Sequence, residues 1–440
     1  MMKTKKKILA VLSTTALFAG ILAGCGSSDS KSASGGGDSK ETTLTLLMDN
    51  QSPAAMEGYK AVAAKFEKKY HIKTEIETRP GGSEGDNLIK TRLSTGDATD
   101  LIAYNSGSLM QALNPEKNFV DLTNEPYMDT ILDTFKTAVT VNKKVYGVPV
   151  GTFNSGGWFY NKKVYKELGL SIPKTWDELM ANNEKIKAAG KTAVIGTYKD
   201  TWTSQVILLA DNYNVLAESP SFPEDFTANK MKMATTPATL RSFEKLEEIS
   251  KKGYMNKDFN ATGYEAGLKM LAEGTGVQYP MISFALANLA KLYPDQIDDI
   301  GFFPQPGDSA DKNGITAWAP GAIYINKASE HVDEAKKWAE FFVSPESQQL
   351  YMSKATPDGP PAIKDVKLPD NVYAAVKDMI PYFDEGKTAP ALEFLSPLKG
   401  PNLPQITSEV GGGMKSAKEG AAAYDQDVEK QAKQLGLKGW

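Results

Sequence analysis

Apolar and polar residues follow two periodicities in the first part of the chain. Three short runs have the pattern of strands, buried or alternating: residues 43–48, 72–77 and 100–104. Between them lie two runs with helical periodicity, residues 52–70 with Pro53 near the start and residues 87–96 with Gly96 at the end. Strand–helix–strand–helix–strand predicts a parallel sheet with helices on both faces.

A second α/β unit is predicted to begin near residue 153. Two runs that are rich in aromatic and β-branched residues, 144–150 and 157–169, read as strands on either side of a loop of small residues. The helix predicted over 173–190 has Thr175 as its cap, and Glu178 completes a capping box. Residues 193–198 then read as another strand.

The rest of the chain is expected to be mixed. Residues 203–300 read as mostly helical, residues 314–325 return to a strand pattern, and residues 331–343 form an amphipathic helix. Trp176 and Trp338 fall on the apolar faces of their helices, which predicts that both lie in the core. Trp158 could lie either in the core or beside a hinge.

The N-terminal residues predict export and a lipid anchor. Four lysines precede an apolar run at 8–18, which is too short to span a bilayer, and the lone cysteine, Cys25, follows. Leu22-Ala23-Gly24-Cys25 resembles the bacterial lipoprotein signal, which predicts a signal peptide over 1–24 and acylation of Cys25. The alternative is an ordinary secretory signal with a chance cysteine. Residues 25–41 are rich in Gly and Ser and would form a flexible linker.

Composition narrows the classes of function. The chain has a formal net charge of −4 and shows no basic block, so we expect no nucleic-acid partner. It has only two histidines and none of the zinc, nucleophile-elbow or phosphate-loop motifs, so we expect no cofactor, no metal and no enzyme activity. Only three of its 50 basic residues are arginines, which weighs against an anionic ligand.

Five segments in order resemble extracellular solute-binding proteins, family 1, of ABC importers, in particular the oligosaccharide and maltodextrin binders. They are LSTGDATDLIAY, KKVYGVPV, FYNKKVYKELGLSIPKTWDEL, KKGYMNKDF and GAIYINKASEHVDEAKKWAEFFVSPESQQLYM. The resemblance implies a two-lobed α/β fold of the periplasmic-binding-protein type II, in which each lobe is a mainly parallel sheet flanked by helices and the ligand cleft lies between the lobes. The implied N-terminal lobe is 42–152 plus 318–370, and the C-terminal lobe is 153–317 plus 371–440.

Candidate ligand contacts follow the predicted strands, where hydroxyl-binding side chains and flat rings would meet a sugar. Asp49, Asn50 and Gln51 follow the first strand, although Asn50 or Ser52 could instead only cap the next helix. The resemblance adds contacts at Tyr104, Asn105 and Ser106, where the alternative is a plain turn. It places an acid at Asp200 and a stacking ring at Trp202, and it puts Phe284 where many members carry a tryptophan. The remaining candidates are Trp318 and Glu393.

The sequence therefore predicts a monomeric, lipid-anchored binding protein on the outer face of the cell membrane of a Gram-positive cell. It would capture a neutral oligosaccharide and deliver it to the transmembrane subunits of an ABC permease. An acidic sugar or oligogalacturonide is the alternative ligand, and for it Arg79, Arg92 or a lysine would have to reach the cleft. An extracellular glycosidase and a surface-binding protein without a transport role are the alternatives outside this class.

Overall fold

A computed structural model describes residues 42–319 and 321–440, without the side chain of Ser83. The predicted signal peptide, the linker and the anchor at Cys25 lie outside the described residues. None of the described helices is long and apolar enough to cross a membrane.

The first sheet has five strands, in which only β12 runs against the others. Its spatial order is β2 (Lys73–Arg79), β1 (Thr43–Asp49), β3 (Leu101–Asn105), β12 (Gly321–Ile325) and β6 (Gly147–Pro149). The first three pair in parallel, as the sequence predicts, while β12 is antiparallel to both of its neighbours. The carboxyl ends of β1, β2 and β3 therefore share one edge of the sheet.

The second sheet is built around one long strand, β7 (Asn154–Asn161). On one side β7 pairs with β9 (Gly276–Ile282), and on the other with β11 (Ile315–Trp318) and then β10 (Ile300–Pro304), always antiparallel. The outer strands are β8 (Thr192–Val194), parallel to β9, and β13 (Thr388–Pro390), parallel to β11. A separate hairpin joins β4 (Thr140–Val141) and β5 (Lys144–Val145).

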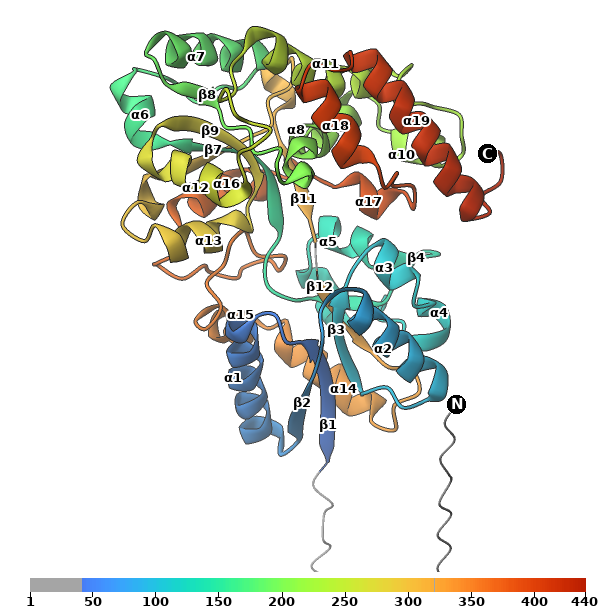
Figure 1. Cartoon of the computed structure of the whole chain (residues 1–440). Coiled ribbons are helices and arrows are strands. Elements are labelled where there is room, and N and C mark those ends of the chain that lie inside the picture. The colour runs from blue at the N-terminus through green and yellow to red at the C-terminus, as the bar shows by residue number, and fades with distance from the viewer. Residues whose placement is uncertain (1–41, 320) are drawn as a thin grey trace, which may run out of the picture. The chain divides into compact units, whose positions relative to one another are not determined.

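Helices cover the first sheet as the strand–helix order predicts. They are α1 (Pro53–Tyr70), α2 (Gly82–Thr95), α3 (Ser108–Gln111), α4 (Pro115–Asn118), α5 (Asp133–Ala138), α14 (Val332–Phe342) and α15 (Pro345–Met352), with the 3₁₀ helix η1 (Pro126–Thr130). In Figure 1, α1 and α2 lie on opposite sides of β1 and β3, and α1 packs against α14 and α15.

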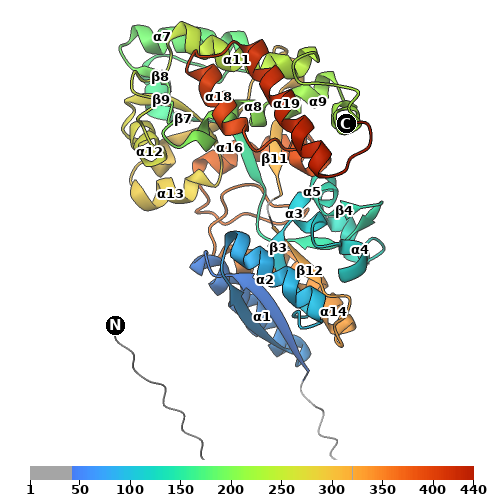
Figure 2. The same ribbon diagram turned by 45° about the vertical axis from the view of Figure 1, so that its right-hand side comes forward.

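The second sheet is covered on both faces. Its helices are α6 (Lys162–Glu167), α7 (Trp176–Ala188), α8 (Val206–Ala210), α9 (Asn212–Glu218), α10 (Phe222–Thr227), α11 (Pro237–Lys252), α12 (Tyr264–Glu273), α13 (Ala285–Leu292), α16 (Ala374–Asp384), α17 (Leu392–Leu395), α18 (Leu403–Gly411) and α19 (Ala417–Gln434), with the 3₁₀ helices η2 (Thr201–Gln205), η3 (Ile297–Asp299) and η4 (Ala310–Lys312). Figures 1 and 2 show α18 and α19 beside α11. Helices α12, α13 and α16 contribute to the core on the other face.

Two expectations about these elements were wrong. The strand predicted over 157–169 ends at Asn161, whose side chain accepts the Val164 N–H and so caps α6. The second sheet is not mainly parallel as expected, because β7 is antiparallel to β9, β10 and β11, and only the outer strands pair in parallel. Residues 203–300 are mostly helical as expected, with the strand β9 at residues 276–282 among the helices. Residues 314–325 have the predicted strand structure, divided into two strands of different sheets, because the chain leaves the second sheet after β11 and enters the first with β12.

Buried aromatic residues anchor both cores. Trp176 and Trp338 are fully buried, which confirms their predicted core positions. The Trp176 Nε1–H donates to Glu248 Oε2 at 2.7 Å, whereas the Trp338 Nε1–H has no partner among the described residues. Trp158 is also fully buried and donates from Nε1 to Gln305 Oε1 at 2.6 Å, so it belongs to the core of the second sheet.

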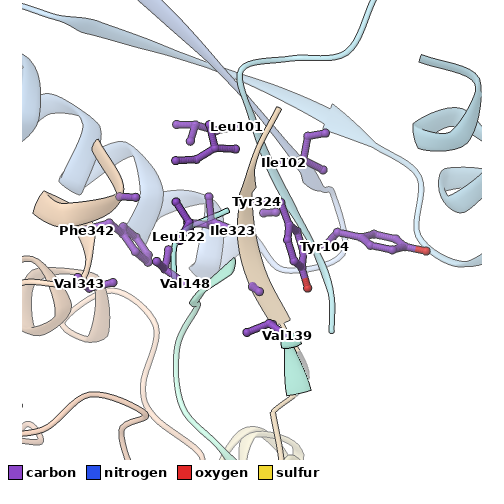
Figure 3. Packing of buried hydrophobic residues seen from close by; sticks show 14 of the residues in the cluster. Leu101, Ile102, Tyr104, Leu122, Val139, Val148, Ile323, Tyr324, Phe342 and Val343 are labelled. Atoms are coloured by element: carbon purple, nitrogen blue, oxygen red, sulfur yellow. The ribbon is translucent and has the colours of Figure 1, made fainter. Parts of the chain in front are cut away.

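The Tyr104 ring lies on the opposite face of the first sheet from several labelled core residues (Figure 3). Figure 3 shows Tyr104 extending away from the side on which Leu122, Val148 and Phe342 pack. This direction follows from the alternation along β3, because successive side chains of a strand point to opposite faces. Tyr104 is nevertheless buried, so its ring packs against the residues around the carboxyl ends of the strands.

The chain segment after β6 packs directly on residues 358–361. The Phe153 N–H donates to Pro360 O at 2.9 Å, and Asp358 Oδ1 accepts from Thr152 Oγ1 and Asn154 Nδ2, both at 3.2 Å. A Cβ at Gly359 would lie 1.8 Å from Phe153 O, so only glycine allows this approach. The lobe boundaries expected from the sequence remain predictions.

Candidate functional site

A small hollow lies at the carboxyl ends of β1, β2 and β3. It has a volume of about 120 Å³, and the side chains that matter here are Asp49, Arg79, Tyr104 and Asn105. We call it the sheet-edge hollow. It gathers three of the predicted ligand contacts, Asp49, Tyr104 and Asn105, because each ends or nearly ends a strand of the same sheet.

The polar groups of this hollow are held in place by local hydrogen bonds. Asp49 Oδ1 accepts the Gln51 N–H at 3.0 Å, and the Tyr104 hydroxyl donates to Asp86 Oδ1 at 2.9 Å. Burial, followed by the bond to Asp86, raises the pKa of the Tyr104 hydroxyl, so the hydroxyl remains protonated at neutral pH. Ser52 caps α1 by accepting the Ala55 N–H, so this role does not fall to Asn50.

Sequence reasoning named Arg79 only as a means of reaching an acidic sugar, yet it lines the sheet-edge hollow. Arg79 is 4% exposed, its Nη1 donates to Pro80 O at 3.0 Å, and its guanidinium carbon lies 5.2 Å from the centre of the Tyr104 ring. The strand predicted to end at residue 77 continues to Arg79. The signal in the sequence was the strand pattern itself, which continues through Thr78 and Arg79 and is interrupted only at Pro80.

A second hollow, of about 740 Å³, is lined by two aromatic rings, and a third ring outside its lining contacts one of them. The Trp202 ring centre is 5.4 Å from that of Tyr264 and 5.9 Å from that of Phe284, both in tilted contact. We call these three residues the aromatic wall. The predicted contacts Trp202 and Phe284 are thus brought together, and Tyr264, which sequence reasoning missed, joins them.

The aromatic wall is assembled from the ends of three elements. Trp202 lies in η2 after β8, Phe284 lies between β9 and α13, and Tyr264 is the first residue of α12. Asp200 links two of these elements, because its Oδ2 accepts the Tyr264 N–H at 2.6 Å. Burial raises the pKa of the Tyr264 hydroxyl, which therefore remains a donor at neutral pH.

The structure places the other predicted contacts outside these two groups. Trp318 is 8% exposed at the end of β11, and its ring lies where a Cβ on Gly156 would be. Ser106 is buried and donates its hydroxyl to Ala319 O, and Glu393 accepts from Lys399. Asn50 and Gln51 are exposed near the sheet-edge hollow. No hydrogen bond, ion pair or ring contact within the described part of the chain joins the sheet-edge hollow to the aromatic wall.

A third hollow, of about 630 Å³, lies between α9, α11 and residues 307–312, and it lacks aromatic lining. Its charged groups are already paired with one another. Lys245 Nζ lies 2.6 Å from Asp211 Oδ1, both side chains being almost fully buried, and Arg241 makes two 2.9 Å hydrogen bonds to Asp308. A sugar would find few free partners here, so we do not place the ligand in it.

The described residues contain no cluster of His, Cys, Asp or Glu suited to a metal ion. The site thus consists of rings, carboxylates, amides and one guanidinium. These groups can bind and orient a polar ligand that has apolar faces.

Comparisons with known proteins give the family. Residues 50–349 match the family model described as bacterial extracellular solute-binding protein. The multiple sugar-binding protein of Streptococcus mutans serotype c is 29% identical over 386 residues, which cover 84% of this chain and 86% of that protein. The melibiose/raffinose/stachyose-binding protein MelE of Bacillus subtilis is 23% identical over 380 residues, 83% of this chain and 84% of that protein.

Solved structures confirm the predicted two-lobed α/β fold class. The apo form of RafE from Streptococcus pneumoniae superposes with a TM-score of 0.73 at 23% identity, covering 89% of this chain and 99% of that one. The binding protein MsmE from Bacillus subtilis, in an open conformation, also gives 0.73, at 15% identity over 91% of this chain and all of that one. The chain belongs to the bacterial extracellular solute-binding proteins, a family of binding proteins rather than enzymes.

Proposed function

We propose that this protein captures a neutral oligosaccharide outside the cell and delivers it unchanged to an ABC permease. The aromatic wall beside Asp200 is the observation that carries the proposal. Sugar rings present apolar C–H faces that pack on aromatic rings, and their hydroxyls need charged or amide partners at the edges. Trp202, Tyr264 and Phe284 offer such faces, and Asp200 offers a carboxylate next to them.

The relatives support a sugar as the ligand class. Their names describe the binding of multiple sugars in Streptococcus mutans and of melibiose, raffinose and stachyose in Bacillus subtilis. A solved relative holds raffinose. All three named sugars are uncharged, which agrees with the neutral ligand predicted from the sequence.

The charges around the hollow of the aromatic wall favour a neutral sugar over an acidic one. Among the described residues, Lys199 is the only cation that lines the hollow of the aromatic wall, and three carboxylates line it as well, those of Asp200, Asp258 and Glu265. Two like charges about 6 Å apart repel by roughly 3 kcal/mol at an effective dielectric constant near 20. An acidic sugar would meet this repulsion, whereas hydroxyls donate readily to carboxylates.

A ligand screen with the purified full-length protein tests the proposal. Thermal unfolding is measured with raffinose, stachyose, melibiose, maltotriose and digalacturonate, for wild type, Trp202→Ala and the control Trp440→Ala. Trp440 packs near Phe226, away from both hollows. A neutral sugar at about 1,000 times its Kd should stabilise wild type and the control by about 4 kcal/mol, and Trp202→Ala much less. A shift with digalacturonate alone, or with no sugar, would exclude the proposed ligand.

The lipid anchor is a separate part of the proposal and has its own test. Acylation at Cys25 would keep the protein at the outer face of the membrane, where a permease could receive the sugar. Cys25→Ser should move the protein from the membrane fraction of the cells that make it to the medium. Retention of Cys25→Ser in the membrane fraction would argue against the anchor.

A further inference from the structure

The three arginines of the chain differ in how their charge is compensated. Arg92 Nη1 lies 2.7 Å from Glu77 Oε2, and Arg241 makes two hydrogen bonds to Asp308. Arg79 has no carboxylate within 4 Å among the described residues, although it is the most buried of the three. Its Nε–H is buried and has no hydrogen-bond partner in the described part of the chain.

An unpaired, buried donor on a charged group is costly, so Arg79 gains from any ligand that supplies an acceptor. Its only described hydrogen bond runs to Pro80 O, and the Tyr104 ring lies against its guanidinium. Neither contact uses Nε. A ligand hydroxyl whose oxygen reached Nε from the hollow would supply the missing acceptor.

Asp49 supplies an acceptor next to this donor. Asp49 and Arg79 are direct partners in the parallel register of β1 and β2, so their side chains leave the same face of neighbouring strands. Neighbouring strands lie about 4.8 Å apart. Asp49 Oδ1 accepts the Gln51 N–H, and no described hydrogen bond uses Oδ2.

We propose that Arg79 and Asp49 form a subsite for two neighbouring hydroxyls of one sugar unit. The guanidinium donates to one hydroxyl oxygen, and the carboxylate accepts the proton of the other. The hollow of about 120 Å³ has room for several waters, hence for the hydroxyl-bearing edge of a sugar ring. This inference rests on the proposed function.

The surroundings of Arg79 favour hydroxyls over a carboxylate of the ligand. Asp49 lines the same hollow, and Asp86 accepts a hydrogen bond from the hydroxyl of Tyr104, whose ring lies against the guanidinium. Around the hollow these two carboxylates outnumber the one guanidinium, although neither lies within 4 Å of it. A neutral diol adds no charge to this group, while the carboxylate of an acidic sugar would.

The test measures affinity by calorimetry for full-length wild type, Arg79→Gln, Arg79→Lys and Arg92→Gln, with raffinose, stachyose, melibiose and digalacturonate. Arg92→Gln is the matched control. Arg92, on α2, is paired with Glu77 of β2 and does not line the hollow. Losing a hydrogen bond from a charged donor should weaken neutral-sugar binding by about 10- to 100-fold in Arg79→Gln. Arg79→Lys should also bind at least about 5-fold more weakly, since it lacks the planar fork. Arg92→Gln should stay within about 2-fold of wild type.

A double-mutant cycle asks whether the two residues act on one sugar unit. Asp49→Asn and Arg79→Gln should each weaken binding, and the double variant should lose clearly less than the product of the two factors. If Arg79→Gln fails to fold by circular dichroism, Arg79→Lys, which keeps the charge and most of the stem, takes its place in the cycle.

The outcomes separate this inference from the proposed function. If wild type binds none of the neutral sugars, the proposed function fails and the subsite fails with it. If wild type binds a neutral sugar and the Arg79 variants match Arg92→Gln, the subsite alone is refuted. Tighter binding of digalacturonate that depends on Arg79 would also refute it, because Arg79 would then serve a carboxylate.

Discussion

Asp200 is expected to stabilise the start of α12 across a gap of 64 residues in sequence. Helix α12 begins at Tyr264, and its N-cap residue, Gly263, has no side chain to offer. The Asp200 carboxylate takes that place by accepting the Tyr264 N–H at 2.6 Å. A negative charge here also interacts favourably with the positive end of the helix dipole.

The size of this effect can be worked from its parts. Removing a capping side chain costs about 0.5–2 kcal/mol, and a hydrogen bond to a charged group contributes about 1.5–3 kcal/mol. These figures describe the same contact and do not add. Asp200 is partly exposed, which lowers the electrostatic part, so Asp200→Ala should cost about 1–2 kcal/mol of unfolding free energy. Asp200→Asn keeps an acceptor oxygen without the charge and should cost about half as much.

Two measurements without sugar check this value. Urea unfolding gives the global free energy, and hydrogen exchange at the Tyr264 amide reports the local opening. A cost of about 1.4 kcal/mol would make that amide exchange about tenfold faster. Glu265→Ala is the control, because it removes a negative charge from the first turn of the same helix but leaves the bond from Tyr264 to Asp200 intact.

The reasoning is refuted if Asp200→Ala costs no more than Glu265→Ala, or if the exchange of the Tyr264 amide is unchanged. In either case the carboxylate would not act as the cap of α12. The position of Tyr264 in the aromatic wall would then need another cause, such as the ring contact with Trp202.

Three further predictions concern buried polar groups. Trp176→Phe should cost about 1–2 kcal/mol more than Trp338→Phe in urea unfolding, because only the Trp176 indole donates a hydrogen bond; equal costs would contradict this. Lys245→Met should lower the free energy of unfolding by about 3–5 kcal/mol, because it leaves Asp211 buried and unpaired. The double variant Lys245→Met/Asp211→Leu should recover most of this loss. A double variant as unstable as the single one would argue against the ion pair as the cause. Burial raises the pKa of the Asp358 carboxyl, so the folded protein favours the protonated form. The stability that this form contributes is lost as pH rises through the folded-state pKa. Asp358→Asn should therefore be more stable than wild type near pH 7 but not near pH 4. A pH-independent difference between the two would contradict the last prediction.

Local signals in the sequence predicted much of the fold. The capping box of Thr175 and Glu178 marks the start of α7, Gly253 ends α11 in the left-handed conformation, and the alternation of short strands and helices predicts the parallel part of the first sheet. These features depend on residues within a few positions of one another. The errors lie at Asn161 and in the strand directions of the second sheet, where the outcome depends on partners far away in the chain.

The candidate site divides in the same way. Asp49, Tyr104 and Asn105 could be predicted together, because the carboxyl ends of parallel strands share one edge. Tyr264 could not, since nothing in its own segment places it beside Trp202. The unpaired Nε–H of Arg79 could not be predicted either, because the absence of an acceptor depends on how residues from distant parts of the chain pack around it.

The position of the aromatic wall at the ends of elements has a consequence for how ligand specificity can change. Trp202 lies in η2, Tyr264 begins α12, and Phe284 immediately precedes α13. Other side chains of these elements are buried, namely Thr203, Leu268 and Leu286. The core thus fixes the directions of these elements, and the rings at their ends remain partly exposed. Replacing one ring by another would alter the surface that a sugar meets while leaving the buried contacts in place. A Phe at 284, where the resemblance to the family leads us to expect a Trp, is a change of this kind, because its smaller ring still contacts Trp202. Differences among sugars are therefore expected to follow from such ring exchanges more than from changes in the sheets.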